Sequence, residues 1–104
     1  MAKTPEGKVK AQVKEVLKAL GAYYVMPVTG GYGNSGVPDF VVCYRGIFFG
    51  IETKAKGGKV TALQQKNLDA IAKAGGIDLV ITEGNVGLLE PFLKNSNHSE
   101  GIKL

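Results

Sequence analysis

Hydrophobic residues in the first part of the chain recur at helical spacing. Thr4-Pro5-Glu6 has the composition of a helix start, with an N-cap threonine, a proline and an acidic residue in the first turn. Gly21 ends the pattern. The apolar stripe consists of Val9, Val13, Val16, Leu17 and Leu20, and Lys8, Lys10, Lys14 and Lys18 lie mostly off it. The pattern predicts an amphipathic helix up to about residue 20.

The middle of the chain contains short apolar runs that are typical of β-strands. Residues 22–26 form one run, which Pro27 stops. Residues 41–50 form two runs broken at Arg45-Gly46, which predicts an antiparallel hairpin. Residues 77–82 form another run, apolar enough to be an internal strand. The glycine-rich segment 29–36 predicts a flexible loop that leads directly to Pro38-Asp39.

A second helix is predicted after the hairpin, because Thr61-Ala62-Leu63-Gln64 has the spacing of a capping box. We expect this helix to bury Leu63, Leu68, Ile71 and Ala72 and to end at Gly75-Gly76. Residues 86–89 predict a short helix before Pro91. The order α-β-β-β-α-β indicates an α/β fold in which helices flank a small mixed β-sheet. We expect one domain over residues 1–94 and a polar, flexible tail over residues 95–104.

The predicted hairpin brings two acidic residues together. With the turn centred on Arg45-Gly46, Asp39 lies opposite Glu52, with Cβ atoms roughly 4.5–5.5 Å apart. Lys54 joins Glu52 on the same face, since side chains alternate along a strand. A two- or four-residue loop keeps this register, and a three-residue loop shifts it by one and moves side chains to the other face.

Adjacent carboxylates repel each other. A cation bound between them removes that repulsion, so the pair can form a metal site. Phosphodiester hydrolysis needs a polarised phosphate, a nucleophilic water and charge compensation, all of which a divalent ion on oxygen ligands can supply. Asp39 and Glu52 are the predicted side-chain ligands, and the backbone carbonyl of Thr53 is a third. Lys54 is predicted to position or deprotonate the water, or to offset phosphate charge. The pattern predicts a metal-dependent nuclease.

Composition narrows the alternatives. The 104 residues carry a net charge of +4, which is compatible with a phosphate-bearing partner. Single Cys43 and single His98 exclude an intrachain disulfide and a Cys/His zinc site. No apolar run approaches the ~20 residues that span a bilayer, and no hydrophobic segment of a signal peptide follows Met1. We therefore expect no membrane partner. The glycine-rich loop lacks the Gly-Lys-Ser/Thr ending of a P-loop, so we also expect no nucleotide cofactor.

The chain resembles the VRR-NUC (virus-type replication-repair nuclease) branch of the PD-(D/E)xK nucleases in three motifs that follow one another in the family's order. These are Gly36-x-Pro38-Asp39, Glu52-x-Lys54 and Thr61-x-x-Gln64. The resemblance covers roughly residues 5 to 82. It implies a Mg²⁺- or Mn²⁺-dependent endonuclease that cuts branched or flapped DNA, as in DNA repair. Stand-alone viral and bacterial members resemble Holliday junction resolvases and act as homodimers. The resemblance therefore implies a homodimer inside a bacterial or phage-infected cell, in the cytoplasm.

The resemblance also assigns roles to residues. Asp39, Glu52 and Lys54 take the catalytic positions, and Gln64 takes that of the family's helix glutamine. Glu6 is the candidate for the helix glutamate that supports the metal site, because it falls near the apolar stripe of its helix. A capping box alone accounts equally well for Gln64, and a helix-dipole interaction does so for Glu6.

Two segments are expected to contact DNA. Tyr32, Asn34 and Ser35 belong to the glycine-rich loop, and Lys56 and Lys59 belong to the basic turn after the hairpin. A solvated turn is the alternative for the two lysines. For the whole chain two other hypotheses stay open, namely a sequence-specific restriction-type endonuclease and a non-catalytic basic nucleic-acid-binding module.

Overall fold

The computed structural model describes residues 4–28 and 36–97 of the chain. Its elements are, in order, α1 (Pro5–Leu20), β1 (Tyr23–Val25), β2 (Phe40–Tyr44), β3 (Ile47–Thr53), α2 (Ala62–Lys73), β4 (Ile77–Ile81), the 3₁₀ helix η1 (Val86–Leu88) and α3 (Leu89–Asn95). The predicted α/β class and the order of the first six elements are confirmed. Within the described ranges, no helix is both long and apolar enough to cross a membrane.

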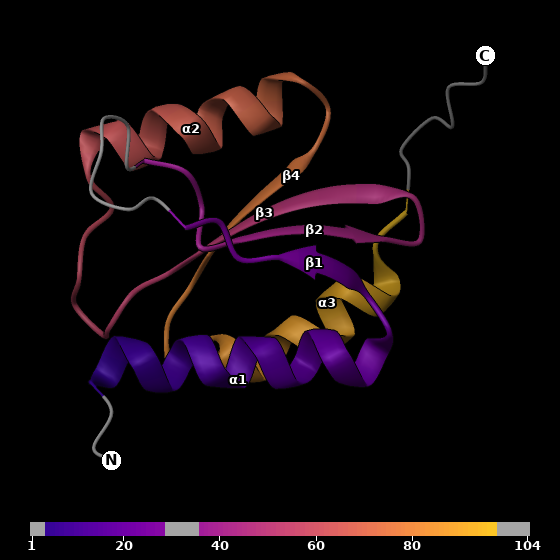
Figure 1. Ribbon diagram of the computed structural model, residues 1–104, viewed down its shortest axis with the longest axis horizontal. Coiled ribbons are helices and arrows are strands. Elements are labelled where there is room, and N and C mark those ends of the chain that lie inside the picture. Colours follow the sequence, from indigo (N-terminus) through magenta and orange to yellow (C-terminus); the bar gives the residue numbers. More distant parts are fainter. Residues whose placement is uncertain (1–3, 29–35, 98–104) are drawn as a thin grey trace.

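The four strands form one mixed sheet in the order β1-β2-β3-β4. Strands β1, β2 and β3 pair antiparallel, and β4 pairs parallel to β3. Helix α2 covers one face of the sheet, whereas α1 and α3 cover the other (Figure 1). Helices α1 and α2 both begin at the end of the sheet where β2 starts and β3 stops (Figure 1). This shared end is where the candidate site lies.

The core fills the space between the sheet and the helices α1 and α3. Helix α1 contributes Val9, Val13 and Leu17 as buried residues, as its apolar stripe predicts. The facing residues of the sheet are Phe40, Val42, Ile47, Phe49, Ile51 and Ile81, and α3 adds Leu89 and Leu93. Thr4 caps α1 as expected, because its side chain accepts a hydrogen bond from the Gly7 backbone N–H.

A two-residue turn sets the register of the β2–β3 hairpin. Arg45 (φ 55°) and Gly46 (φ 82°) both have positive φ values, which is the signature of a type I′ turn. Tyr44 pairs with Ile47 and Val42 with Phe49, which is the register expected for a turn centred on Arg45-Gly46. The Arg45 guanidinium donates a hydrogen bond to the Lys94 carbonyl near the end of α3, so the strained turn residue also ties the hairpin to a helix.

The region after the hairpin corrects two predictions. Leu68 of α2 is buried and Ile71 is half-buried, but Leu63 and Ala72 are exposed, so the expectation that all four are buried is wrong for Leu63 and Ala72. Strand β4 lies at the edge of the sheet, not inside it. Its apolar composition has a different cause, because β4 packs against α2 and places Ile81 in the core.

The sequence prediction also missed α3. The chain was expected to stop being helical before Pro91, but Pro91 occupies the first turn of α3. Proline is tolerated there, because the first backbone N–H groups of a helix have no intrahelical partner. The expected polar tail starts where α3 ends, and its residues 98–104 lie outside the described part of the chain.

Gly36 allows the segment before β2 to pack against the first turns of α2. A Cβ atom at this position would lie 2.6 Å from the Leu63 carbonyl oxygen and 2.7 Å from the Asn67 amide nitrogen. Gly36 is itself buried. The close approach fixes the path of the chain into Pro38-Asp39, so the glycine of the first motif has a packing role.

We predict that Gly36→Ala lowers the free energy of unfolding by about 1–3 kcal/mol, because the added methyl group overpacks a site walled partly by backbone. Gly87→Ala is the matched control, since a Cβ there meets nothing within 4 Å. The control is expected to stay within about 0.5 kcal/mol of the wild type. Urea denaturation measures both, and equal stability of the two variants would contradict the packing role.

Candidate active site

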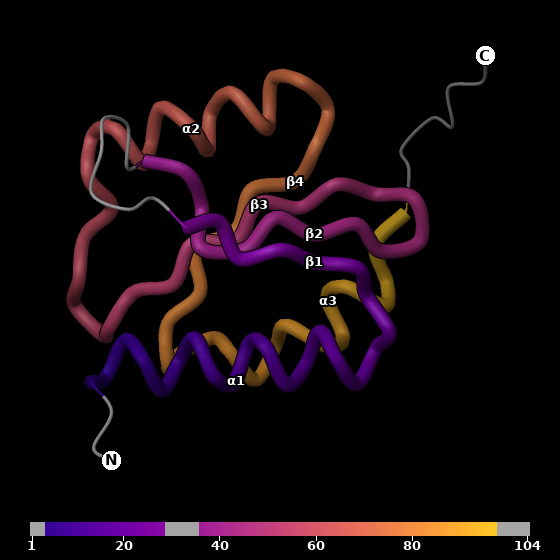
Figure 2. Tube along the Cα trace, viewed as in Figure 1, coloured from indigo at the N-terminus to yellow at the C-terminus, as the bar shows by residue number. Residues whose placement is uncertain are grey.

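Three segments bring polar side chains to the shared end of the sheet. Asp39 directly precedes β2, Glu52 and Lys54 lie at the end of β3, and Gln64 lies in the first turn of α2. The connection from β3 to α2 runs around the same end (Figure 2). The structure therefore brings together the side chains of all three sequence motifs.

Glu52 is the centre of this arrangement. The residue is only 2% exposed. Its Oε2 accepts a hydrogen bond from Gln64 Nε2 at 2.8 Å and lies 3.7 Å from Lys54 Nζ. Its Oε1 is also buried, and no described group donates a hydrogen bond to it. A buried carboxylate oxygen without a donor is costly. Glu52 Oε2 faces Gln64 and Lys54, so it is Oε1 that a proton or a cation would satisfy.

Burial raises the pKa of Glu52 from its ordinary value of 4.5 to about 7. The negative charge of Asp39 is the next cause, and that of Glu6 adds a smaller increase in the pKa. The Lys54 ammonium and the Asp39 backbone amide oppose these effects and lower the pKa. Asp39 and Glu6 are therefore electrostatic neighbours of Glu52, and a metal-free Glu52 takes up a proton near neutral pH.

Asp39 differs from its predicted arrangement. The β2–β3 pairing ends at Phe40 and Ile51, one residue before Asp39 and Glu52 would pair. Pro38 precedes Asp39 and cannot donate a ladder hydrogen bond. The Asp39 carboxylate bonds instead to Thr53, with Oδ2 accepting from its backbone N–H at 2.9 Å and from its hydroxyl at 2.6 Å. The carboxylate is thus fixed at the end of the strand and turned toward α1.

Thr53 is fully buried and holds Asp39 in place. Its backbone carbonyl was predicted as a metal ligand. In a strand, the N–H and C=O groups of one residue point to the same edge, so this carbonyl lies on the Asp39 side of β3. The role of the Thr53 hydroxyl was missed, although the hairpin register already placed Thr53 beside Asp39.

Gln64 combines the two roles that were considered for it. Its backbone N–H donates to the Thr61 hydroxyl, and its side-chain Oε1 accepts from the Thr61 backbone N–H at 2.9 Å, which completes a capping box. Its Nε2 remains available and donates to Glu52. The cap therefore orients the amide that holds the carboxylate.

Helix α1 supplies two further charged residues. Glu6 is half-buried and acts electrostatically on Glu52, which agrees with its predicted position beside the site. One turn later, Lys10 Nζ lies 3.6 Å from Asp39 Oδ1. Sequence reasoning assigned Lys10 no role. The available signal was its spacing, because residues i and i+4 lie on the same side of a helix.

The structure describes only some of the residues that were predicted to contact DNA. Lys56 and Lys59 are exposed in the connection between Lys54 and α2, next to the site. Tyr32, Asn34 and Ser35 lie outside the described residues.

The donor set fits a divalent cation held by few protein ligands. Within residues 4–28 and 36–97, no group of three or more His, Cys, Asp or Glu side chains could hold a metal ion. Two carboxylates and a backbone carbonyl remain, and hard cations such as Mg²⁺ commonly bind through one or two carboxylates and retain water. The unpartnered Glu52 Oε1 is the observation that fits a cation most directly.

We predict that Glu52→Gln removes a pH dependence of stability in metal-free protein. Between pH 4.5 and 7 the folded state binds a proton that the unfolded state has lost, so Glu52 lowers the free energy of unfolding as the pH rises through this range. The wild type is expected to lose about 3 kcal/mol relative to Glu52→Gln across the range. Urea denaturation in EDTA measures the difference.

Glu90→Gln is the control for this experiment, because Glu90 forms an exposed pair with Lys94 away from the site. It is expected to keep the wild-type dependence on pH. The same dependence in Glu52→Gln would show that the Glu52 carboxylate is not the group that titrates.

A comparison with solved structures found a close match in fold. A structure described as a VRR_NUC domain superposes with a TM-score of 0.69 and 29% sequence identity. The match covers 84% of this chain and 95% of the other. No family model and no curated protein matched the chain. The match agrees with the three motifs, which the fold gathers at one end of the sheet, and over most of its length the chain is similar to a VRR_NUC domain.

Proposed function

We propose that the protein is a Mg²⁺- or Mn²⁺-dependent endonuclease that hydrolyses phosphodiester bonds in branched DNA, in the manner of a Holliday junction resolvase. The observation that carries the proposal is the buried Glu52, whose Oε1 accepts no hydrogen bond from any described residue and whose pKa is raised to about 7 by burial and by the charge of Asp39. Perturbed ionisable groups of this kind concentrate at functional sites. The similarity to a VRR_NUC domain supports the same chemistry.

Asp39, Glu52 and the Thr53 carbonyl would hold the ion, with Glu6 adding negative charge nearby. When bound, the ion would polarise the scissile phosphate and lower the pKa of a bound water. Gln64 fixes Glu52 through Oε2 and leaves Oε1 for the ion. The two bonds from Thr53 restrict Asp39 in a similar way. The protein's contribution is a pair of carboxylates held in position before substrate arrives.

Lys54 is the candidate for positioning or deprotonating the attacking water, or for offsetting the charge of the phosphate. Its side chain is only 12% exposed, and its ammonium lies 3.7 Å from Glu52 Oε2. Lys54 directly follows the last residue of β3 and is two residues from Glu52, so the alternation of side chains puts both on the same side. A lysine held there would offset phosphate charge, or would help to position and deprotonate the attacking water.

The proposed substrate is branched DNA, bound by a homodimer. Two copies of a small domain related by a two-fold axis would present two cleavage sites to a symmetric four-way junction. The net charge of +4 favours a polyanionic partner. The exposed Lys56 and Lys59 flank the site and are the proposed contacts to phosphates near the cut, together with the loop residues Tyr32, Asn34 and Ser35.

The proposal predicts metal-dependent cleavage of labelled four-way junctions and flaps. With Mg²⁺ or Mn²⁺ the wild type should cut these substrates in preference to linear duplex, and EDTA should stop cleavage. Asp39→Ala should reduce the rate at least about 100-fold, because it removes a ligand. Glu90→Gln should cleave like the wild type, since Glu90 is remote from the site. Gel analysis of the products measures each rate.

Three other outcomes would each contradict a particular part of the proposal. Equal cleavage by the wild type and Asp39→Ala would contradict the site assignment. Cleavage of linear duplex at a fixed sequence would favour a restriction-type enzyme. Binding of DNA without cleavage of any substrate would favour a non-catalytic binding module and would contradict the proposed function.

A further inference from the structure

A row of lysines runs along one side of α1. Lys10, Lys14 and Lys18 are spaced four residues apart, so they follow one another along the helix surface. Each step advances about 6 Å along the helix axis, and the row spans about 12 Å. The three lysines line an open groove of about 340 Å³, together with Met26 just beyond β1.

The row starts at the candidate active site. Lys10 Nζ lies 3.6 Å from Asp39 Oδ1, and Asp39 is one of the two carboxylates proposed to hold the ion. Lys14 and Lys18 lead away from that point toward the C-terminal end of α1, and both are exposed. A phosphate bound at the site would therefore have a line of positive charge beside it.

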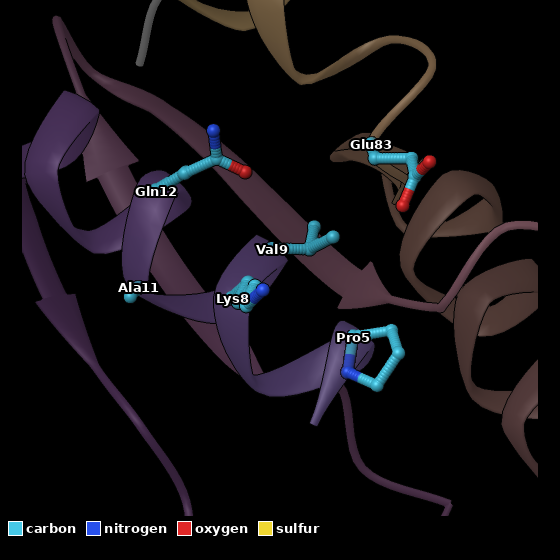
Figure 3. A pocket seen from close by; sticks show the side chains of 6 residues that line it. All are labelled: Pro5, Lys8, Val9, Ala11, Gln12 and Glu83. Carbon is cyan, nitrogen blue, oxygen red and sulfur yellow. The ribbon is translucent and has the colours of Figure 1, made fainter. Parts of the chain in front are cut away.

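The charge around α1 is asymmetric. The groove with the row contains three lysines and one acidic residue, Glu15. A second hollow, of about 520 Å³, lies along another part of the α1 surface. There Lys8 is accompanied by Glu83 from the segment after β4 (Figure 3). One lysine and one glutamate nearly cancel, so a polyanion is favoured at the row and not at the second hollow.

We propose that Lys10, Lys14 and Lys18 bind phosphates along one strand of a DNA arm that leaves the active site along α1. The inference rests on the proposed function, because it takes DNA as the substrate. One strand of duplex DNA presents a phosphate about every 3.4 Å of helix axis, so a row of about 12 Å runs beside roughly three to four phosphate steps, and lysines about 6 Å apart would lie beside about every second phosphate. Contacts of this kind orient the duplex and carry no sequence information, which suits an enzyme that selects structure.

Binding measurements without cleavage test the proposal. Fluorescence anisotropy with a labelled four-way junction in EDTA gives Kd at several salt concentrations. Lys14→Gln/Lys18→Gln is expected to raise Kd at least about 10-fold and to reduce the slope of log Kd against log salt by about 2. The charge-matched control, Lys8→Gln/Lys73→Gln, removes two exposed lysines outside the row and should change Kd less than about 3-fold.

Cleavage by the same variants separates binding from chemistry. Among the described residues, Asp39 forms its ion pair with Lys10 and Glu52 forms its ion pair with Lys54, and neither pairs with Lys14 or Lys18. With Mn²⁺, Lys14→Gln/Lys18→Gln should therefore raise KM and leave kcat within about 2-fold of the wild type. Thermal melts of all variants should coincide, because the substituted side chains are exposed.

The failure of this inference is distinguishable from the failure of the proposed function. If the wild type cleaves junctions but both double variants bind equally well, the lysine row is not the binding surface and the nuclease assignment stands. If the wild type neither binds nor cleaves any DNA, the proposed function itself is wrong, and the inference that rests on it falls too.

Discussion

The burial of the Glu52 carboxylate is the constraint on which the site depends. A charged group is unfavourable when it is 2% exposed and when one of its oxygens accepts no hydrogen bond from the described part of the chain. The structure compensates part of this cost through Gln64 and Lys54, and a proton compensates it further near neutral pH. A divalent cation would replace the proton, so a conformation that is costly when empty becomes favourable when loaded. Cores retain such groups mainly where function requires them.

Local structure around Glu52 serves to hold the other groups still. The capping box at the start of α2 uses one end of the Gln64 side chain and directs the other end at Glu52. Pro38 ends the ladder, so the Asp39 side chain takes the Thr53 N–H. Gly36 lets the segment that leads into Asp39 pack against α2. Secondary-structure termini therefore supply the rigidity that a small domain cannot obtain from a large core.

The parts of the structure that follow from local rules were predictable from the sequence. The hairpin register and the capping box depend on a turn and on spacing, and both placed Glu52, Lys54 and Gln64 correctly. The spacing of Glu6 and Lys10 puts both on one side of α1, but the ion pair between Lys10 and Asp39 also depends on how α1 packs across the sheet, which the spacing does not give. The edge position of β4 was missed because an apolar strand covered by helices resembles an internal one. Helix α3 was missed because Pro91 acts as a breaker only beyond the first turn.

The central claim is that Glu52 and Asp39 share one divalent cation and that the cation displaces a proton from Glu52. Calorimetric titration of Mn²⁺ in two buffers of different ionisation enthalpy tests it most directly, because the pair of measurements yields both affinity and protons released. The account predicts about one ion per chain, with proton release near pH 6–7 that fades above pH 8, and loss of both in Glu52→Gln. Unchanged Mn²⁺ affinity in Glu52→Gln, or binding without proton release at pH 6–7, would contradict it.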